Sequence, residues 1–220
     1  MSLRHALLAI LEARSMTGYE LSKQFGASVG FVWRAKHSQI YPELRKLESE
    51  GLVRTTEVQR GKSAVKWSYS LTSEGVDELN RWVNELEIPQ LERSAAHLKV
   101  TYLEYGSYDM ARRHFRNHAE YFAAQRIVWQ THADALRSAS TSLMQTRLGR
   151  AESDEARAAI RAYKVHVYEG LVARADAEIS WAERGVQLVD DLQAAAGASG
   201  SDLASPARTA NGWAETGLTG

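Results

Sequence analysis

The sequence lacks cysteine altogether and contains only three prolines in 220 residues. Without cysteine there are no disulfides and no thiolate chemistry, which excludes a small disulfide-bonded extracellular fold and favours a reducing cytoplasm. No apolar run approaches the length of about 18 residues that a membrane helix needs, so no membrane association is expected. Basic and acidic residues balance at 27 each, which excludes a globally basic nucleic-acid binder but not a local basic patch.

Motifs for common catalytic chemistry are also missing. The chain has no P-loop, no G-x-S-x-G, no H-E-x-x-H and no glycine-rich dinucleotide turn, so we expect no enzyme and no cofactor. His114 and His118 have the i, i+4 spacing that can hold a metal on one helix face. No acid or cysteine stands at a matching position, so these histidines are interpreted as solvated or core residues and no metal is expected.

The first 86 residues contain a change of hydrophobic period. Helical spacing predicts helices at about 2–14, from Thr17 to about Gly26 behind a Thr17/Glu20 capping box, and at about 38–50 before Gly51. Alternating segments at 52–58 and 64–71 flank a turn at 59–63 and predict a β-hairpin. A further helix follows Thr72, to about residue 86. The order is typical of a winged helix-turn-helix domain, residues 1–86, with a two-stranded β-wing.

The helix at 38–50 stands in the recognition position of that pattern. Ile40, Leu44 and Leu47 share one face, which leaves polar and basic side chains on the other. Pro42 is expected in the first turn, marking Ser38–Gln39 as the helix entry. From residue 14 to residue 66 there are ten basic and five acidic residues, an excess of five positive charges in a neutral protein.

These features predict a DNA-binding surface, because arginine and lysine suit guanine and phosphate while hydroxyls suit phosphate oxygens. The predicted DNA-binding residues are Tyr19, Lys23, Arg34, Lys36, Ser38, Gln39, Tyr41, Pro42, Arg45, Lys46, Arg60, Lys62, Ser63 and Lys66. Two other interpretations stay open. One is a winged-helix module for protein–protein interaction, and the other is a ligand sensor without direct operator binding.

The same residues carry a family resemblance. Trp33, the segment from His37 to Val53, the segment from Tyr69 to Gly75 and Trp82 resemble the PadR family of bacterial transcriptional regulators. The resemblance covers about residues 1–86. The later helices, with Tyr168-Glu-Gly170 and Glu178-Ile-Ser-Trp181, resemble its longer, virulence-regulator-like branch. The resemblance implies a homodimer, most often a repressor, with Tyr41 and Pro42 facing operator DNA and the hairpin acting as the wing.

The rest of the chain predicts a helical dimerisation domain at 89–196, which makes the fold mainly α. Expected helices run from Pro89 to Tyr105, from Ser107 to about 147–150, and from 153 or 154 to about 196. Phe115, Phe122, Trp129, Leu136 and Leu143 recur every seven residues, which favours a coiled-coil-like contact. The predicted dimerisation residues are Phe115, Phe122, Trp129, Leu136, Leu171 and Ile179. Residues 197–220 are low in complexity and predict a disordered tail.

Beside that apolar row runs a polar one: His118, Gln125, His132 and Ala139. It could fix the register between subunits, line a ligand cavity or border solvent. Trp33, Trp67, Trp82, Trp129, Tyr102 and Tyr105 could stack an aromatic small-molecule effector, although buried aromatic residues more often belong to a core. The predicted partners are therefore double-stranded promoter DNA, a second copy of the chain and an unidentified effector.

Overall fold

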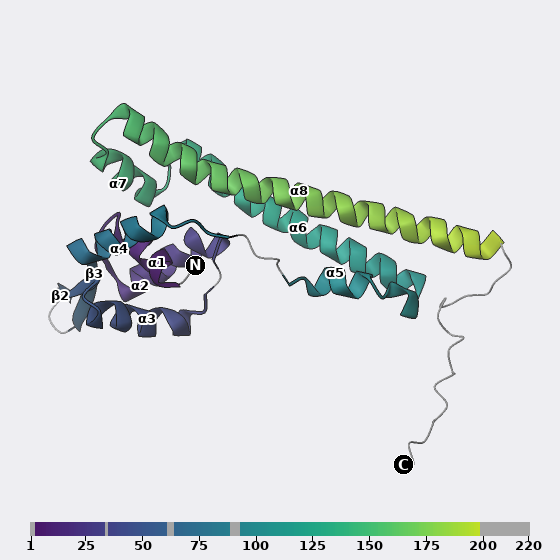
Figure 1. Ribbon diagram of the computed structural model, residues 1–220, viewed down its shortest axis with the longest axis horizontal. Coiled ribbons are helices and arrows are strands. Elements are labelled where there is room, and N and C mark those ends of the chain that lie inside the picture. The colour runs from purple at the N-terminus through teal and green to yellow at the C-terminus, as the bar shows by residue number, and fades with distance from the viewer. Residues whose placement is uncertain (1–2, 34, 61–63, 89–92, 199–220) are drawn as a thin grey trace, which may run out of the picture. The chain divides into compact units, whose positions relative to one another are not determined.

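The computed structural model describes residues 3–33, 35–60, 64–88 and 93–198, leaving aside the side chains of residues 37, 59, 60, 64 and 65 (Figure 1). The described residues form two compact units. Unit 1 comprises residues 1–89 and 134–165, and unit 2 comprises residues 90–133 and 166–220. The division into DNA-binding and dimerisation domains stays a prediction about function. The predicted disordered tail lies outside the described residues from 199 onward.

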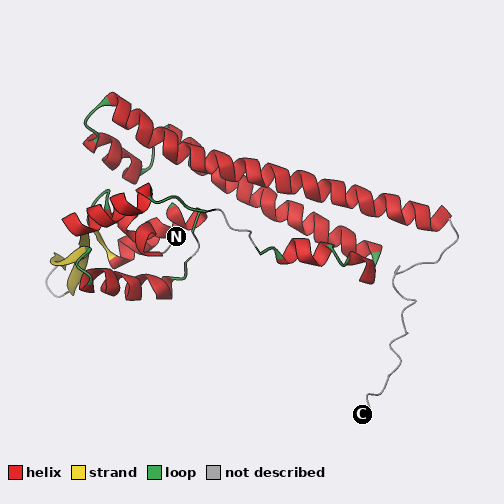
Figure 2. Cartoon of the chain, viewed as in Figure 1, coloured by secondary structure: helices red, strands yellow, loops and turns green. Residues whose placement is uncertain are grey.

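Unit 1 contains a winged helix-turn-helix, as the sequence predicts. Its elements are α1 (Leu3–Leu11), β1 (Met16–Thr17), α2 (Gly18–Gly26), the 3-10 turn η1 (Val29–Phe31), α3 (His37–Ser49), β2 (Val53–Arg60), β3 (Ala64–Leu71) and α4 (Ser73–Asn84). The sheet is antiparallel with strand order β1-β3-β2 (Figure 2). Strand β1 was not expected, because two residues are too short to show an alternating pattern; Met16 and Thr17 pair with Tyr69 and Ser68.

The core of unit 1 is assembled from the apolar faces of α1, α2 and α3. Its largest fully buried side chains include Leu7, Leu8, Leu21, Ile40, Leu44 and Leu47. The predicted inner face of α3 is therefore confirmed: Ile40, Leu44 and Leu47 are each at most 1% exposed. Burial of this kind contributes about 1.5–3 kcal/mol per large aliphatic side chain, so α3 is held firmly on its inner side.

Two local motifs explain how the elements of unit 1 begin. Thr17 and Glu20 form the predicted capping box, with the Glu20 carboxylate accepting from the Thr17 backbone N–H at 2.8 Å. Thr72 caps α4 by accepting from the Gly75 N–H at 3.0 Å, and its hydroxyl donates to the Gly51 carbonyl at 2.7 Å. A Cβ at Gly75 would lie 2.1 Å from the Leu52 carbonyl oxygen, so only glycine fits there.

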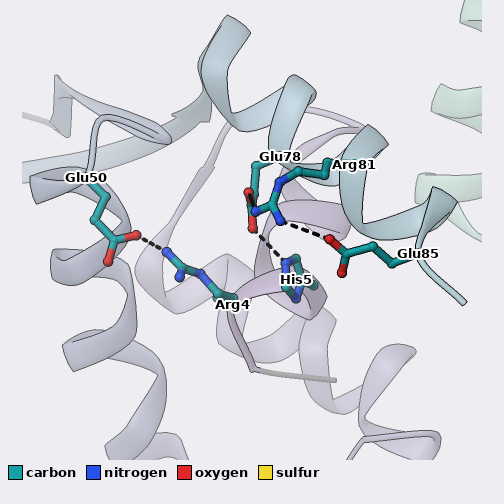
Figure 3. A network of polar contacts seen from close by, with 6 residues as sticks. All are labelled: Arg4, His5, Glu50, Glu78, Arg81 and Glu85. Carbon is teal, nitrogen blue, oxygen red and sulfur yellow. Dashed lines mark hydrogen bonds and ion pairs between the residues drawn. The ribbon is translucent and has the colours of Figure 1, made fainter. Parts of the chain in front are cut away.

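A polar network ties α1 to α3 and α4 (Figure 3). Arg4 on α1 pairs with Glu50 immediately after α3. His5 lies 2.9 Å from the Glu78 carboxylate and stacks on Trp82 with ring centroids 4.8 Å apart. Arg81 pairs with both Glu78 and Glu85 on the same helix. The N-terminal turn of α1 is thereby linked by polar contacts to the end of α3 and to α4, outside the apolar core.

The short helix α7 (Ser142–Arg150) also belongs to unit 1, which corrects one expectation. The predicted helix from Ser107 to about 147–150 is two helices, α6 (Tyr108–Arg137) and α7. Ala139 has a φ of 52°, and the hydroxyls of Ser138 and Ser140 donate back to carbonyls of α6, which ends that helix. Thr141 then caps α7. Leu143 therefore leaves the predicted seven-residue row and enters the unit 1 core.

Two arginines of α7 bind the C-terminal end of α1. The Arg147 guanidinium donates to the Glu12 carboxylate at 3.0 Å and to the Ala9 carbonyl. Arg150 donates to the Glu12 and Ala13 carbonyls at 2.7 and 3.1 Å. These carbonyls belong to the last turn of α1 and to the two residues that follow it, where intrahelical donors run out and a cation is favoured. A segment distant in sequence thus caps the first helix of the winged-helix fold.

Unit 2 consists of α5 (Ala95–Val100), the 3-10 turn η2 (Leu103–Tyr105) and most of α6 and α8 (Asp154–Ala198). The expected single helix from Pro89 to Tyr105 is therefore wrong over its described part. Ser94 starts α5 by capping His97, and the backbone leaves the helix at Tyr102. The run Val100-Thr101-Tyr102 favours this end, since β-branched and aromatic residues lose side-chain freedom in a helix. The expected last helix is confirmed.

Within unit 2, α6 and α8 pack side by side in opposite directions (Figure 1). Arg112 pairs with Asp190, His118 pairs with Glu178 at 2.8 Å, and Arg126 pairs with Asp176. The ring of Phe115 lies where a Cβ on Gly185 would stand, so glycine lets the helices approach. None of the helices that the structure describes has the length and apolar character needed to cross a membrane.

Candidate nucleic-acid interface

The outer face of α3 is the centre of the candidate interface. Ser38, Gln39, Tyr41, Pro42, Arg45 and Lys46 are all exposed there, opposite the buried stripe of Ile40, Leu44 and Leu47. Because that stripe is anchored in the core, the outer side chains are presented on a rigid support. No ion pair ties Arg45 or Lys46 to an acid among the described residues, so both cations are available to a ligand.

The entry of α3 is set by Lys36 and Gln39. The Gln39 side-chain oxygen accepts from the Lys36 backbone N–H at 2.9 Å, which orients the amide and leaves its NH₂ group outward. The helix begins at His37, so Pro42 is its sixth residue and the expected place in the first turn is wrong. Pro42 has no N–H to offer the Ser38 carbonyl, which leaves that acceptor for water or for a ligand donor on the exposed face.

Tyr41 is positioned by a glycine of α2. Its ring packs so closely on Gly18 that a Cβ there would lie 2.6 Å from the ring edge. The ring still remains 42% exposed, so its hydroxyl can reach outward. Tyr19, the next residue of α2, is 69% exposed, and Lys23 lies one helical turn further on. The start of α2 and the start of α3 therefore each carry an exposed tyrosine.

The wing is only partly described. Lys62 and Ser63 at its tip lie outside the described residues, as does Arg34, and the same holds for the side chain of Arg60. Lys66 on β3 is half-buried and close enough to Glu20 to help lower the pKa of that carboxyl, although the Thr17 backbone hydrogen bond is the larger cause. The roles assigned to these wing residues stay predictions.

The sheet also places a residue that sequence reasoning did not assign to DNA. Trp67 on β3 is 55% exposed, and it lies on the same face of the sheet as Tyr69. Burial raises the pKa of Tyr69, and the nearby Glu48 carboxylate on α3 adds to that rise. The alternation of β3 in the sequence already indicated that residues 67 and 69 share a face, but not which face lies beside α3.

The predicted dimerisation residues are already packed within the single chain. Phe115, Trp129 and Leu136 are buried, while Phe122, Leu171 and Ile179 are half-buried. Their assignment to an interface between subunits stays a prediction. The large apolar side chains that α6 and α8 leave exposed are other residues, namely Met110, Tyr121, Ile127, Val128, Tyr163, Val167, Leu188 and Leu192.

A second polar site lies in unit 2, where α6 and α8 carry aromatic rings. His132 and Tyr168 have ring centroids 4.4 Å apart. Burial lowers the pKa of His132 and raises the pKa of Tyr168 to about 12, so both are neutral near pH 7. One turn before His132, the buried Trp129 indole N–H has no acceptor among the described residues. A buried donor of this kind is uncommon and is usually satisfied by a water or a ligand.

The chain is similar to known transcriptional regulators. Residues 7–81 match the model of the transcriptional regulator PadR-like family. The negative transcriptional regulator PadR of Bacillus subtilis is 35% identical over 102 residues, which is 46% of this chain and 56% of that relative. The chain thus spans about half the length of this curated relative.

Solved structures extend the likeness over most of the chain. B. subtilis PadR in complex with operator DNA has a TM-score of 0.68 at 26% identity, over 85% of this chain and 98% of that one. The structure of the same protein in complex with p-coumaric acid has a TM-score of 0.63 and covers 86% of this chain and 95% of that one. The Vibrio cholerae virulence activator AphA gives 0.62 at 23% identity, over 87% and 99%, and shows likeness of fold. The expected resemblance to the PadR family is confirmed over residues 7–81, and the later helices share the fold of these regulators.

Proposed function

We propose that this protein is a sequence-specific DNA-binding transcriptional regulator that acts on promoter operators, because residues 7–81 match the model of the PadR-like family. The observation that carries the proposal is the outer face of α3, where Tyr41, Arg45 and Lys46 stand exposed on a helix anchored by three buried aliphatic residues. The operator-bound structure of a relative with this fold supports it. Such a regulator works in the cytoplasm, where it meets the chromosome.

The recognition chemistry follows from the residue types on that face. Arg45 suits a bidentate contact with guanine or phosphate, and Lys46 neutralises phosphate. The hydroxyls of Ser38 and Tyr41 and the free amide of Gln39 suit phosphate oxygens or base edges at the N-terminal end of α3. The wing residues Arg60, Lys62 and Ser63 would then reach the adjacent groove or its backbone.

The regulator acts as a homodimer in this proposal. Unit 2 leaves Ile127, Val128, Leu188 and Leu192 exposed on two long helices, and a second copy would cover such apolar side chains. A twofold dimer presents two α3 helices to two half-sites, so the operator is pseudo-palindromic with half-site centres about 34–36 Å apart or a multiple of it. Occupying a promoter in this way blocks polymerase, which makes repression the expected sign.

An aromatic acid is the effector class that the structure supports. The relative that binds p-coumaric acid has this fold, and unit 2 holds the neutral His132 and Tyr168 beside a buried indole donor on Trp129. A phenolic acid offers a carboxylate or hydroxyl to that donor and a ring to the aromatic pair. Binding there favours the arrangement of the dimer that does not fit the operator, which relieves repression.

The test is fluorescence anisotropy of the full chain on labelled DNA from upstream of its own gene, against a scrambled duplex, at two salt concentrations. Tight, salt-sensitive binding that prefers the native duplex supports the proposal. Arg45→Ala should lose about 1–3 kcal/mol of specific binding, and Lys46→Ala should flatten the salt slope. Arg116→Ala, an exposed arginine of unit 2, is the control and should bind as wild type.

Three results would redirect the interpretation. Wild-type affinity in both α3 variants contradicts the assigned DNA face. No binding at either salt favours a winged-helix module for a protein partner. Quenching of tryptophan fluorescence by p-coumaric acid, without any operator protection, favours a ligand sensor that acts indirectly.

A further inference from the structure

Trp67 on the wing is a large aromatic side chain that the fold leaves exposed. It is 55% exposed, although β3 is the central strand of the sheet. Its neighbours on the same face, Tyr69 and Leu71, are partly buried and pack on the unit 1 core. The core therefore ends between Tyr69 and Trp67. Trp67 projects beyond the core, and packing within the chain does not explain a large aromatic side chain at this position.

The strand register shows on which side Trp67 projects. Residues 67, 69 and 71 of β3 pair with Glu57, Thr55 and Val53 of β2, so these six residues share one face. On that face Thr55 donates a hydrogen bond to Glu48 of α3. The Glu48, Arg45 and Tyr41 side chains of α3 also act on the pKa of Tyr69. The face that carries Trp67 is thus the one beside α3.

Trp67 lies two residues closer to the wing tip along β3 than Tyr69. Two residues of a strand span about 7 Å, so the indole lies about that far out from the point where the sheet meets α3. Arg45, one of the α3 side chains that act on Tyr69, is itself exposed on the outer face of that helix. A duplex that receives this face of α3 would bring its backbone alongside the indole.

We propose that Trp67 is a DNA-contact residue of the wing, with its indole N–H donating to a phosphate oxygen and its ring covering the adjoining deoxyribose. The inference rests on the proposed DNA-binding function and adds a contact to it. Indole suits this position because it has one apolar face and one donor, and it carries no charge. Glu57 stands directly opposite on the same face, so the local contact with phosphate cannot depend on net positive charge.

The absence of charge gives the contact a distinctive measurable property. A lysine or arginine that neutralises phosphate releases counterions, so its removal flattens the dependence of affinity on salt. Trp67 releases none. Trp67→Ala should therefore weaken operator binding about 10-fold, the order expected for one hydrogen bond to a charged group, at every salt concentration with the slope unchanged. Trp67→Phe keeps an aromatic ring but has no N–H donor, so its affinity for the operator should lie between those of wild type and Trp67→Ala.

The experiment is anisotropy of wild type, Trp67→Ala, Trp67→Phe and Val58→Ala on the same operator duplex across a salt series. Val58 is the matched control, because it is an exposed apolar residue of the same hairpin that lies on the opposite face of the sheet. Val58→Ala should bind as wild type. Tryptophan emission is the second measurement: wild type should change on adding DNA, and Trp67→Phe should lack most of that change.

The outcomes separate the inference from the function on which it rests. If wild type binds the operator and Trp67→Ala binds equally well, the inference is overturned and the function stands. An equal loss in Val58→Ala also overturns it, since removing any exposed apolar side chain of the hairpin would then have the same effect. Failure of wild type to bind any duplex would overturn the proposed function itself. Thermal unfolding of each variant should match wild type, because Trp67 contributes little to the core.

Discussion

The two compact units bury their apolar side chains to very different extents. In unit 1, the aliphatic residues of α1, α2 and α3 meet in one core and are almost completely covered. In unit 2, the cluster around Phe115 contains Ala111, Ala182 and Val189, while Ile127 remains 65% and Leu188 55% exposed. The fixed surface of unit 1 suits the proposed contact with DNA, and the exposed apolar side chains of unit 2 suit the proposed contact with a second copy.

Polar contacts differ between the units in the same way. Unit 1 uses partly buried groups that link distant segments, such as Arg147 of α7 on the end of α1. In unit 2, two of the ion pairs between α6 and α8, Arg112–Asp190 and Arg126–Asp176, are more exposed, while His118–Glu178 is partly buried. Exposed pairs add little stability, whereas groups that satisfy the last carbonyls of a helix add more. Unit 1 should therefore be the more sensitive unit to single substitutions.

The largest expected effect is the loss of a core leucine of α3. Leu44→Ala removes a fully buried side chain and should cost about 2–5 kcal/mol of unfolding free energy, measured by urea denaturation. Leu188→Ala in unit 2 is the matched change at an exposed leucine and should lie within about 0.5 kcal/mol of wild type for an uncovered side chain. A large loss in Leu188→Ala that depends on protein concentration would show that a second copy covers it.

Gly75 offers the next largest effect. A methyl group there would meet the Leu52 carbonyl oxygen, so Gly75→Ala must displace backbone and should cost about 1–3 kcal/mol. Gly149→Ala in α7 is the control, because nothing lies within 4 Å of its added Cβ and alanine is the better helix former. It should raise stability by about 0.5–1 kcal/mol. Equal behaviour of the two variants in calorimetry would contradict the close approach at Gly75.

These positions show how far local sequence patterns extend. The capping box at Thr17, the cap at Thr72 and the buried stripe of α3 depend on residues within a few positions of one another, so spacing alone predicted them. The same is true of Gly51, whose φ of 75° fits the predicted C-terminal position after α3. Periodicity therefore predicted the winged helix and the outer face of its recognition helix.

What the sequence did not predict depends on distant contacts or on weak local preferences. The sequence pattern extended the seven-residue row to Leu143. In the structure, the hydroxyls of Ser138 and Ser140 donate to backbone carbonyls of α6, and the helix ends before Leu143. No local sequence pattern predicted the hydrogen bonds of Arg147 to Ala9 and Glu12, which lie more than 130 residues away in the sequence. The strand register was also needed to decide which face of the sheet lies beside α3, and therefore on which side Trp67 stands.

The attachment of α7 to α1 predicts an intermediate effect. Arg147→Met keeps the aliphatic length but removes the donor to the Ala9 carbonyl and the nearer of the two arginines at the Glu12 carboxylate, at an expected cost of about 1–3 kcal/mol. Arg126→Met in unit 2 breaks an exposed pair and should cost about 0–1 kcal/mol. Thermal unfolding of both proteins measures the difference, and a larger loss in Arg126→Met would reverse the proposed contrast between the units.

The smallest effect concerns acid stability and the network on α1. Hydrogen bonds from His5 and then Arg81 lower the pKa of Glu78, so its charged form stabilises the folded state. A carboxyl whose folded pKa lies below its unfolded value near about 4.3 contributes stability that is complete above that pH. The contribution is lost as the pH falls through the lower, folded pKa.

Glu78→Gln should therefore lower stability at neutral pH and weaken the decline below about pH 4.3, since the variant has no proton to take up there. Glu85→Gln is the matched control at the end of the same helix, where the carboxylate is exposed and pairs with Arg81. Its stability curve against pH should follow that of wild type closely. Parallel curves for Glu78→Gln and wild type would mean that His5 and Arg81 gain nothing from the charge of Glu78, and α1 would then be held by the apolar core, Arg4 and the arginines of α7.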